Sequence, residues 1–348
     1  MTRHIISEKS TILDALKKLN KLSGQPMVLV AVDNNGVVKG TLTDGDIRRA
    51  LLGGASTDTA VAEVMHREFK HLQGDIIDVK KMKQYRQMGI KLLPHLAEDG
   101  TIKQLYDLTV TRTILPLSAI LMAGGRGERL RPLTDSTPKP LLPIAGKAII
   151  DYNIEALATY GITDITVTTR YLAEQLHNHF ATPVSGVMVK CVEETEPLGT
   201  IGAASLVERN AEGATLVMNS DLLTTISFEE MYLKHIHEGA DITIAAIPYI
   251  VSVPYAILAT DNATVTGIEE KPAYSYFANA GIYIFSNDLL NSLKSDQRTD
   301  ATDLIERAIS EGRKVVYYAI NGTWIDVGSP TDFKHAEEIM QHHNGMLS

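Results

Sequence analysis

The sequence predicts an α/β protein in which a small α+β part precedes a larger part built on a mixed, mainly parallel sheet. Three observations favour this class. The chain has 348 residues, which is more than one hydrophobic core usually holds. Its first third repeats one pattern twice, and the remainder alternates short apolar strands with helical patterns. We therefore expect two domains, at residues 1–112 and 117–348.

The first domain contains two copies of one unit, at about residues 1–60 and 64–112. The copies are displaced by 64 positions, so that Asp14 corresponds to Asp78 and Gly36 to Gly100. In each copy a helical pattern is followed by an apolar strand, a glycine turn and a second strand. The expected elements are a helix capped by Ser10 or Thr11, strands 27–32 and 37–42, a helix over 46–52, a helix from about Ile76 to Met88, a strand over 91–96 and another strand after Gly100.

The second domain begins with an apolar strand over 117–122. Strands interleaved with helices at this spacing indicate a sheet covered on both faces, with a ligand crevice at the carboxyl ends of its strands. The expected elements are strands 117–122, 164–168, 186–192 and 214–218, and helices 149–159, 199–207 and 331–342.

Composition and charge limit the classes of function. Hydrophobic residues make up 44% and charged residues 22% of the chain, as in ordinary folded proteins. The formal net charge of −9 would repel a nucleic acid backbone, and no run approaches the ~20 apolar residues that span a bilayer. The single cysteine, Cys191, lies in an alternating apolar run typical of a buried structural thiol. We expect a cytoplasmic protein without nucleic acid or membrane partners.

A glycine-rich segment follows the first strand of the second domain and is the most informative part of the chain. Its glycines, Gly124, Gly125 and Gly127, let the backbone approach a polyanion and aim successive N–H groups at it. Arg129 and Lys139 add full positive charges. The segment matches neither the Walker loop nor the dinucleotide fingerprint. Taken alone, it fits a phosphate-binding loop and a solvated glycine turn equally well.

This segment and five later ones, in the same order, resemble the sugar-nucleotidyltransferase family, the nucleoside-diphosphate-sugar pyrophosphorylases. The resemblance covers about residues 117–340 and implies a Rossmann-like nucleotidyltransferase domain. The later segments are Pro197-Leu198-Gly199-Thr200 with Gly202, Asn219-Ser220-Asp221, Glu269-Glu270-Lys271-Pro272, Asn279-Ala280-Gly281-Ile282-Tyr283 and Trp324-Ile325-Asp326-Val327-Gly328.

The resemblance implies an enzyme in which a sugar 1-phosphate attacks the α-phosphorus of a nucleoside triphosphate and releases pyrophosphate. Because the nucleophile is already anionic, positioning and electrostatics dominate such a reaction, and no Ser, Cys or His base is needed. Mg²⁺ is the implied cofactor, with Asp221 and Asp326 as its ligands. Arg129 and Lys139 would hold the β and γ phosphates. Either aspartate alone fits a turn or helix cap as well.

The remaining site residues are also implied by the resemblance. Lys271 would reach the phosphate of the sugar and Glu270 a sugar hydroxyl. The Asn279 amide would bond another hydroxyl, while Gly281 lets the ring lie against the backbone. A solvated strand end is the alternative interpretation of the Glu269–Lys271 run. Which sugar is bound stays open among mannose, glucosamine, heptose and glucose 1-phosphates.

Glu194 lies where relatives of this family hold the residue that reads the base. A carboxylate can accept from N1–H and N2–H₂ of guanine, whereas it is repelled by the carbonyls that flank N3–H of uracil. The Gly199-Thr200 loop, in its Pro-Leu-Gly-Thr form, is also similar to that of mannose- and heptose-phosphate guanylyltransferases. We therefore favour GTP, with UTP as the alternative. In the plainer interpretation, Glu194 or Glu193 only faces water.

The first domain resembles a tandem pair of CBS domains, named after cystathionine β-synthase, which sense adenosyl ligands. In that family the Thr and Asp of G-x-x-T-x-x-D touch phosphate and ribose, which here implies Thr43 and Asp46. Equally, Thr43 only caps the helix that follows. The second copy has Asp107 and Val110 at these positions, so at most one site is expected, for an adenine nucleotide.

Rival functions remain at this point. The pair of CBS domains either senses a nucleotide or assembles a homo-oligomer. The second domain is either an active enzyme of nucleotide-sugar biosynthesis or a non-catalytic relative that binds nucleotide sugars. Retention of Arg129, Lys139, Asp221 and Asp326 favours the enzyme, since mere binding needs no pair of metal carboxylates. A cytidylyl or choline-phosphate transferase is a weaker third alternative.

Overall fold

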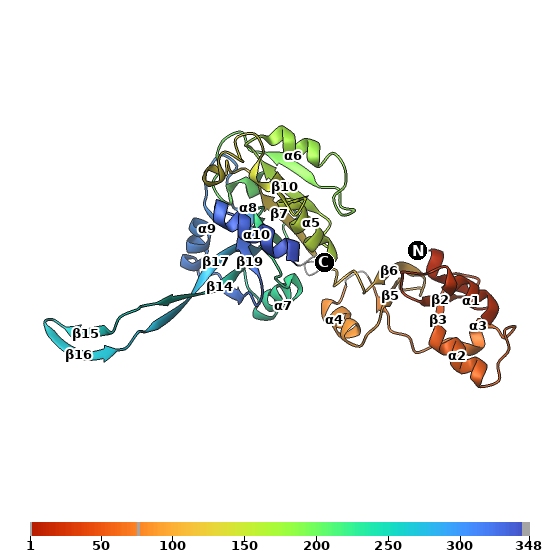
Figure 1. Ribbon diagram of the computed structural model, residues 1–348. Coiled ribbons are helices and arrows are strands. Elements are labelled where there is room, and N and C mark those ends of the chain that lie inside the picture. The colour runs from red at the N-terminus through yellow and green to blue at the C-terminus, as the bar shows by residue number, and fades with distance from the viewer. Residues whose placement is uncertain (1, 75–76, 343–348) are drawn as a thin grey trace. The chain divides into compact units, whose positions relative to one another are not determined.

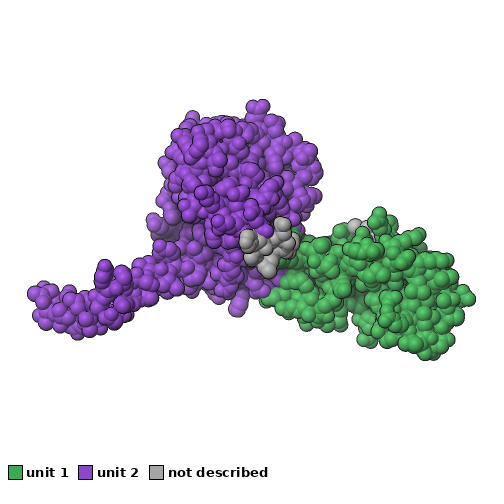
Figure 2. All heavy atoms as spheres, in the orientation of Figure 1, with its two compact units in different colours: residues 1–115, 159–161 green, residues 116–158, 162–348 purple. Residues whose placement is uncertain are grey.

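A computed structural model describes residues 2–74 and 77–342. The chain divides into two compact units (Figure 2). The N-terminal unit contains the chain up to Leu115 together with Thr159–Gly161, and the C-terminal unit contains Pro116–Ala158 and the chain from Ile162 onward. No helix in the described part of the chain is long and apolar enough to cross a membrane.

The internal repeat of the N-terminal unit is confirmed in its strands. Each copy forms a three-stranded sheet, β1-β2-β3 in the first and β4-β5-β6 in the second. Strands β2 and β5 begin at residues 28 and 92, and β3 and β6 at residues 38 and 102, which keeps the displacement of 64 positions. The elements are η1 (Thr2–His4), β1 (Ile5–Ser7), α1 (Ile12–Asn20), β2 (Val28–Val32), β3 (Val38–Thr43), α2 (Asp44–Leu52), α3 (Val61–Val64), β4 (Leu72–Gln73), α4 (Val79–Gln87), β5 (Leu92–Leu96) and β6 (Ile102–Asp107).

The helices depart from that displacement, so the expected correspondence of Asp14 with Asp78 is wrong. Thr11 caps α1 and forms a reciprocal capping box with Asp14, which is inside the helix. Asp78 is itself the cap of α4 and accepts from Lys81 N–H at 3.0 Å. The second helix therefore begins three positions late relative to the strands. Part of the expected helix start, Ile76, lies outside the described residues.

The two copies share a buried cluster in addition to the cluster that each has of its own. Val30 and Val38 of the first copy form a buried cluster with Leu92 and Leu96 of the second. The backbones also meet next to the two turn glycines, where Val38 N–H donates to Gly100 O at 3.0 Å. Since burying such side chains stabilises a fold by about 1.5–3 kcal/mol each, neither copy is complete without the other.

The C-terminal unit is built on a mixed, mainly parallel sheet, as predicted. Its described strands run in the order β11-β10-β7-β12-β17-β14-β18, and only β17 is antiparallel to its neighbours. Ile120, Val217 and Phe285 of the sheet pack on Leu290 and Leu304 of two helices. The strands are β7 (Leu117–Met122), β10 (Ile165–Thr169), β11 (Lys190–Glu193), β12 (Ala214–Asn219), β14 (Ile242–Ser252), β17 (Ala273–Ser286) and β18 (Val315–Ala319).

Shorter elements complete this unit (Figure 1). They are η2 (Glu128–Leu130), η3 (Lys139–Leu141), β8 (Pro143–Ile144), β9 (Lys147–Ala148), α5 (Ile149–Thr159), α6 (Ala173–His179), η4 (Gly202–Leu206), β13 (Leu222–Thr224), α7 (Phe228–Glu238), β15 (Ile257–Asp261), β16 (Thr264–Glu269), α8 (Asn287–Asn291), α9 (Ala301–Ser310), β19 (Trp324–Asp326) and α10 (Pro330–His342).

Two expected elements are shorter than the sequence predicted. The strand expected over 186–192 begins only at Lys190, because Ser185 and Gly186 adopt positive φ and turn the chain back on itself. The helix expected over 199–207 is only a short 3₁₀ helix over 202–206. The N–H groups of Ile201 and Gly202 are used by Thr299 O, which delays its start.

A two-stranded arm leaves the sheet. The ends of β14 and β17 remain paired beyond their neighbours, as far as Ser252 and Ala273, and β15 and β16 then continue as a hairpin. Figure 1 shows β15 and β16 at the far end of this ribbon. We call residues 248–277 the arm.

Candidate active site

The glycine loop follows β7 at the carboxyl edge of the sheet. Gly127 adopts φ +62°, and a Cβ there would lie 3.1 Å from Cβ of Lys139 and 3.0 Å from the Thr134 methyl group. The Thr134 hydroxyl donates to Gly127 O at 2.9 Å and fixes the loop. The glycine is therefore required for close packing of the loop against the segment that carries Lys139.

Pairing of β13 with β19 brings Asp221 and Asp326 together. Leu222 lies opposite Asp326 in this antiparallel pair, and Val327 N–H donates to Asp221 O at 3.1 Å. The aspartates are 105 positions apart in the chain but adjacent at this edge. The arrangement on which the proposed metal site depends is thus present in the fold.

Lys139 lies between the two carboxylates. Its ammonium group forms an ion pair with Asp221 Oδ2 and lies 3.7 Å from Asp326 Oδ1. The side chain is buried. A buried lysine stays charged only with such partners, so this cluster holds one cation between two anions.

Lys139 does not fully compensate the negative charge of the two carboxylates. Asp221 Oδ1 and Asp326 Oδ1 are both buried and accept no hydrogen bond from the described residues. Burial, together with the neighbouring Asp221 carboxylate, raises the pKa of Asp326 above its ordinary value. A divalent cation would satisfy both oxygens. A pair of carboxylates is a donor set that fits Mg²⁺, because this ion takes one or two carboxylates with water and phosphate oxygens.

Arg129 closes the other side of this edge. Gly328 allows this, since a Cβ there would lie 3.1 Å from the Arg129 guanidinium. A cavity of about 360 Å³ opens between these groups; its lining residues include Gly125, Gly127, Arg129, Lys139 and Asp221. The structure therefore gathers the glycine loop, both cations and two carboxylates, Glu128 and Asp221, around one hollow. Arg126, in contrast, lies over the Tyr171 ring at 5.8 Å and is absent from that lining.

Glu194 is buried beside the glycine loop and does not face water. A Cβ on Gly124 would lie 2.5 Å from Glu194 Oε1, so the carboxylate occupies the space that the glycine leaves. Burial raises the pKa of Glu194, while the Leu198 N–H and the charge of Arg170 oppose that shift. The exposed Glu193 makes no such approach.

The Gly199-Thr200 loop is held by the start of α9. Thr200 N–H donates to Asp300 Oδ1 at 2.9 Å, and the Thr200 hydroxyl accepts from Ala301 N–H at 2.8 Å. Gly199 adopts φ +84°, and a Cβ there would lie 2.5 Å from Thr299 O. Both residues shape the loop, and their predicted contact with a nucleotide remains a prediction.

Asn279 and Gly281 lie where β17 crosses the carboxyl edge. Asn279 Oδ1 accepts from Gly281 N–H at 3.0 Å, and Gly281 allows Asn219 of β12 to approach its Cα. Trp324 Nε1–H donates to Ala280 O at 2.9 Å and ties β19 to this point. Asn279 is exposed, although its side chain already interacts with Gly281 N–H and Tyr283.

Glu270 and Lys271 lie elsewhere. They are exposed on the arm between β16 and β17, and neither lines the cavity. No ion pair or hydrogen bond joins the Lys271 side chain to another residue in the described ranges. The structure therefore does not bring this pair to Asp221 and Asp326 within one chain.

Sequence reasoning missed the supporting roles of Asn153, Ser220 and Gly328. Asn153 on α5 is buried and donates through Nδ2 to Ser220 O at 3.3 Å, which steadies the turn before Asp221. Ser220 in turn donates to Met122 O at 2.7 Å. A polar Asn153 amid the apolar face of α5 was the available signal. Gly328 was quoted in a motif, but its role in seating Arg129 needs the fold.

In the N-terminal unit, Thr43 and Asp46 satisfy each other. Thr43 caps α2, its hydroxyl donates to Asp46 Oδ2 at 2.6 Å, and Asp46 also pairs with Arg49. A cleft of about 640 Å³ is lined by Thr43 together with Asp44, Gly45, Lys70 and Lys91, but not by Asp46. Thr43 therefore caps α2, whether it also binds a ligand stays a prediction, and ligand contact by Asp46 requires that box to open.

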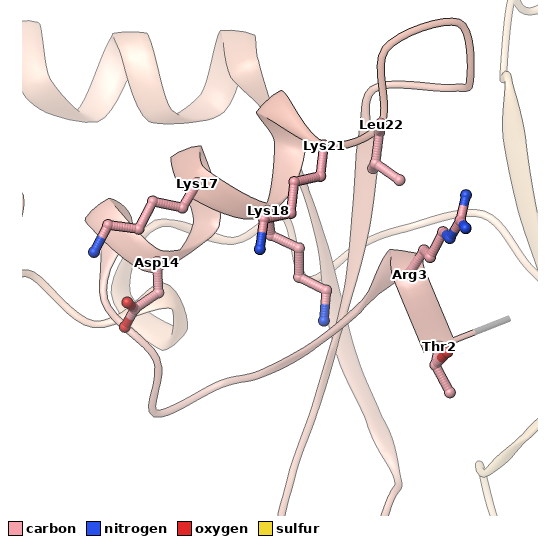
Figure 3. Close-up of a pocket in the computed structure, with 7 residues that line it drawn as sticks. All are labelled: Thr2, Arg3, Asp14, Lys17, Lys18, Lys21 and Leu22. Carbon is pink, nitrogen blue, oxygen red and sulfur yellow. The ribbon is translucent and has the colours of Figure 1, made fainter.

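A second hollow in this unit, of about 710 Å³, is basic (Figure 3). Arg3, Lys17, Lys18 and Lys21 surround it, from α1 and the first turn of the chain. The Lys18 ammonium group already donates a hydrogen bond to Ile5 O. Solvated lysines on one helix face are ordinary, so these charges alone define no site.

The fold and the cavity define a class of protein, an α/β protein with a charged cavity at the carboxyl edge of its sheet. The chain belongs to the nucleotidyl transferase family, whose model matches residues 118–343. Residues 1–53 match the CBS domain, so the first copy of the repeat carries this match.

Named relatives agree with the family. The chain is 31% identical over 242 residues to mannose-1-phosphate guanyltransferase beta-A of Xenopus laevis, covering 65% of this chain and 67% of the relative. It is 30% identical over 223 residues to the mannose-1-phosphate guanylyltransferase catalytic subunit beta of Drosophila melanogaster, covering 62% of this chain and 60% of the relative.

Solved structures support the fold alone. A Bacillus anthracis protein assigned as a glucose-1-phosphate thymidylyltransferase, with a sucrose, aligns with a TM-score of 0.52 at 23% identity, over 64% of this chain and 94% of that chain. HddC from Yersinia pseudotuberculosis, complexed with GMP-PN, aligns with a TM-score of 0.50 at 24% identity, over 64% of this chain and 99% of that chain.

Proposed function

We propose that this protein transfers a nucleotidyl group from a nucleoside triphosphate, with GTP favoured, to a sugar 1-phosphate and releases pyrophosphate. The cavity beside Lys139 carries the proposal. There, two buried carboxylate oxygens, Asp221 Oδ1 and Asp326 Oδ1, accept no hydrogen bond at an edge that also presents a glycine loop and Arg129. Orphaned buried carboxylates are costly, and their cost is explained if they hold a cation during a reaction between anions. The names of the relatives support the same substrate class.

Each residue at the cavity would have a role of its own. Asp221 and Asp326 would hold Mg²⁺, which supplies neutralisation of phosphate charge and orientation when bound. Lys139 fixes both carboxylates and counters the charge of the triphosphate. Arg129, exposed at the mouth, can form a bidentate contact with a phosphate. The loop amides from Gly124 to Gly127 provide neutral donors that need no reorganisation.

Pyrophosphate release tests this function directly. We expect release with Mg²⁺ from GTP and one of mannose, glucosamine, heptose or glucose 1-phosphate, and no release without the sugar phosphate. Binding of a nucleotide sugar without any release across a panel of triphosphates would favour the non-catalytic alternative. Release with cytidine triphosphate and phosphocholine only would favour the third alternative, a cytidylyl or choline-phosphate transferase.

The choice of GTP rests on Glu194. Its burial beside Gly124 puts an acceptor next to the loop that would hold the triphosphate. A buried carboxylate discriminates strongly between a base that offers two donors and one that offers carbonyls, because unpaired polar groups are costly. We expect Glu194→Gln to lower kcat/KM with GTP by about 10- to 100-fold and to spare UTP.

Glu193→Gln is the matched control, since its side chain is exposed on the neighbouring residue. It should leave the ratio of GTP to UTP activity unchanged. If both variants behave alike, Glu194 does not read the base.

We also propose a ligand for the N-terminal unit. The cleft beside Thr43 combines the N-terminus of α2 with Lys70 and Lys91, and this chemistry suits a phosphate group with an attached nucleoside. Adenine nucleotides should then raise the unfolding temperature or change the rate of pyrophosphate release. If millimolar AMP, ADP and ATP change neither quantity, the unit serves assembly only.

A further inference from the structure

The arm exposes an unusual amount of apolar surface. From Pro248 to Lys271 every residue is exposed or half-buried. Its large apolar side chains that remain exposed are Tyr249, Ile250, Val251, Tyr255, Ile257, Leu258, Val265, Ile268, Tyr274, Tyr276 and Phe277. They sit on a ribbon whose charged residues are only Asp261, Glu269, Glu270 and Lys271.

Such a ribbon is unstable as a free element. Beyond Ala246, where pairing with β18 ends, neither edge of the arm pairs with a third strand among the described residues. Two-stranded ribbons are marginal in water without a packed face, and open apolar edges invite association. The exposed side chains amount to on the order of 1,000 Å² per chain, against about 800 Å² per partner in a standard stable interface. The surface is therefore large enough for a dimer.

The cavity lacks charge that the arm could bring. Its lining residues include two cations, Arg129 and Lys139, and two carboxylates, Glu128 and Asp221, so their formal charges cancel. A sugar phosphate adds about two negative charges to those of the triphosphate. Lys271 is exposed and has no described partner.

We propose that a second copy of this chain covers the arm, and that Lys271 of the partner subunit completes each cavity on its sugar-phosphate side. A two-fold arrangement makes the exchange reciprocal, so each arm crosses to the other copy. This inference rests on the proposed function for the identity of the anion. The association itself rests on the apolar arm.

The ladder favours the partner over the chain's own cavity. Pairs run without a break from Ala246 opposite Asn279 to Ser252 opposite Ala273, and Val253 N–H then donates to Pro272 O at 2.9 Å, next to Lys271. Pairing resumes at Ile257 opposite Glu269 and has one register shift, between Ala259 and Thr260. Bending the arm back would break these pairs or kink the ribbon. Crossing to a second copy keeps the ladder intact and buries its side chains.

Complementation between two inactive variants tests the exchange. Lys271→Ala removes the arm cation, and Asp221→Asn removes a cavity carboxylate. The two full chains are co-expressed with different tags, and the mixed oligomer is isolated by both tags in turn. In a mixed dimer, one of the two sites then has an intact cavity and receives an intact arm. We expect pyrophosphate release at about half the wild-type rate per dimer, with each variant alone below about 1%.

Two matched mixtures serve as controls. Lys271→Ala with Glu270→Ala places both defects on the arm, and Asp221→Asn with Lys139→Met places both in the cavity. Neither mixed dimer should recover activity. An isolated Lys271→Ala and Asp221→Asn dimer that stays inactive overturns the proposal, as does full activity of a monomer. Inactive wild-type protein would instead refute the proposed function.

Association has its own readout, independent of turnover. Ile268→Asp with Tyr276→Asp places charges on the arm without touching the core of the sheet. Sedimentation should then show a monomer where the wild-type chain is a dimer or larger. Titration of GTP should give an unchanged Kd, because the triphosphate side of the cavity belongs to one chain. A variant that remains fully associated would remove the arm from the interface.

Discussion

The cavity of the C-terminal unit and the cleft of the N-terminal unit differ in how their motif residues are satisfied. At the cavity, the lining residue Asp221 and its neighbour Asp326 each keep one buried oxygen without a hydrogen bond. At the cleft, the lining residue Thr43 donates to Asp46, and Asp46 also pairs with Arg49. A polar group that is buried and unpaired carries a free-energy cost that a ligand can repay, whereas a paired group is already stable.

This difference predicts that the aspartate pair serves a reaction and that Thr43 and Asp46 stabilise the fold. Both pairs come from sequence motifs, and both lie at the end of a strand. Only the first pair is held in a state that a cation would relieve. We therefore expect loss of the aspartates to affect turnover strongly and loss of the cap to affect stability first.

Replacing Asp221 should give the largest effect. Asp221→Asn removes one metal carboxylate and the partner of Lys139. Turnover should fall by about 100- to 1,000-fold, as when a main electrostatic group of an active site is lost. The unfolding temperature should change little, because losing the pair with Lys139 destabilises the fold whereas removing the repulsion with Asp326 stabilises it. Pyrophosphate release and thermal unfolding measure the two effects.

Asp164→Asn is a control for the loss of one surface charge, because Asp164 pairs with Lys190 far along the sheet from its carboxyl edge. Its turnover should equal that of the wild type. Turnover of Asp221→Asn within twofold of wild type would mean that the orphaned oxygens serve no cation.

The sequence was a good guide to what is local or periodic. Strand β7 and helix α5 have the predicted limits, since apolar periodicity and flanking glycines act over a few residues. The ordered motifs also predicted that Asp221 and Asp326 would meet at one edge. Their pairing through β13 and β19 follows from topology that the family resemblance carried.

The features that the sequence could not predict depend on distant contacts. The helix over 199–207 was wrong because Thr299 captures its first N–H groups from a hundred residues away. The sites of Glu270 and Lys271 could not be placed, since nothing in their own segment fixes where the ribbon leads. The hydrogen bond from the Thr43 hydroxyl to Asp46 depends on the positions of both side chains, which a sequence pattern does not fix.

A pair of cap variants sharpens the contrast at the cleft. Thr11→Ala and Thr43→Ala each break a capping box of the same design, in α1 and α2. Each should lower the free energy of unfolding by about 1 kcal/mol, measured by chemical denaturation. Only Thr43 lines the cleft, so only its variant should also reduce an unfolding-temperature shift caused by adenine nucleotide. Equal shifts in both variants would leave Thr43 as a cap and nothing more.

The smallest expected effect concerns His235, a buried histidine whose Nδ1 already has a hydrogen-bond partner. His235 on α7 is buried, and its Nδ1 lies 2.9 Å from the Thr243 hydroxyl. Burial lowers the pKa of His235 below its ordinary value of 6.5, against a smaller opposing effect of Asp241. The unfolded chain therefore binds the proton more readily, and the free energy of unfolding should decrease as the pH falls below about 6.5. His235→Asn keeps an acceptor near Thr243 and should reduce this pH dependence, whereas His237→Asn, at an exposed position of the same helix, should not. Denaturation between pH 7.5 and 5.5 measures both slopes, and equal slopes in the two variants would show that burial of His235 does not set the acid sensitivity of the fold.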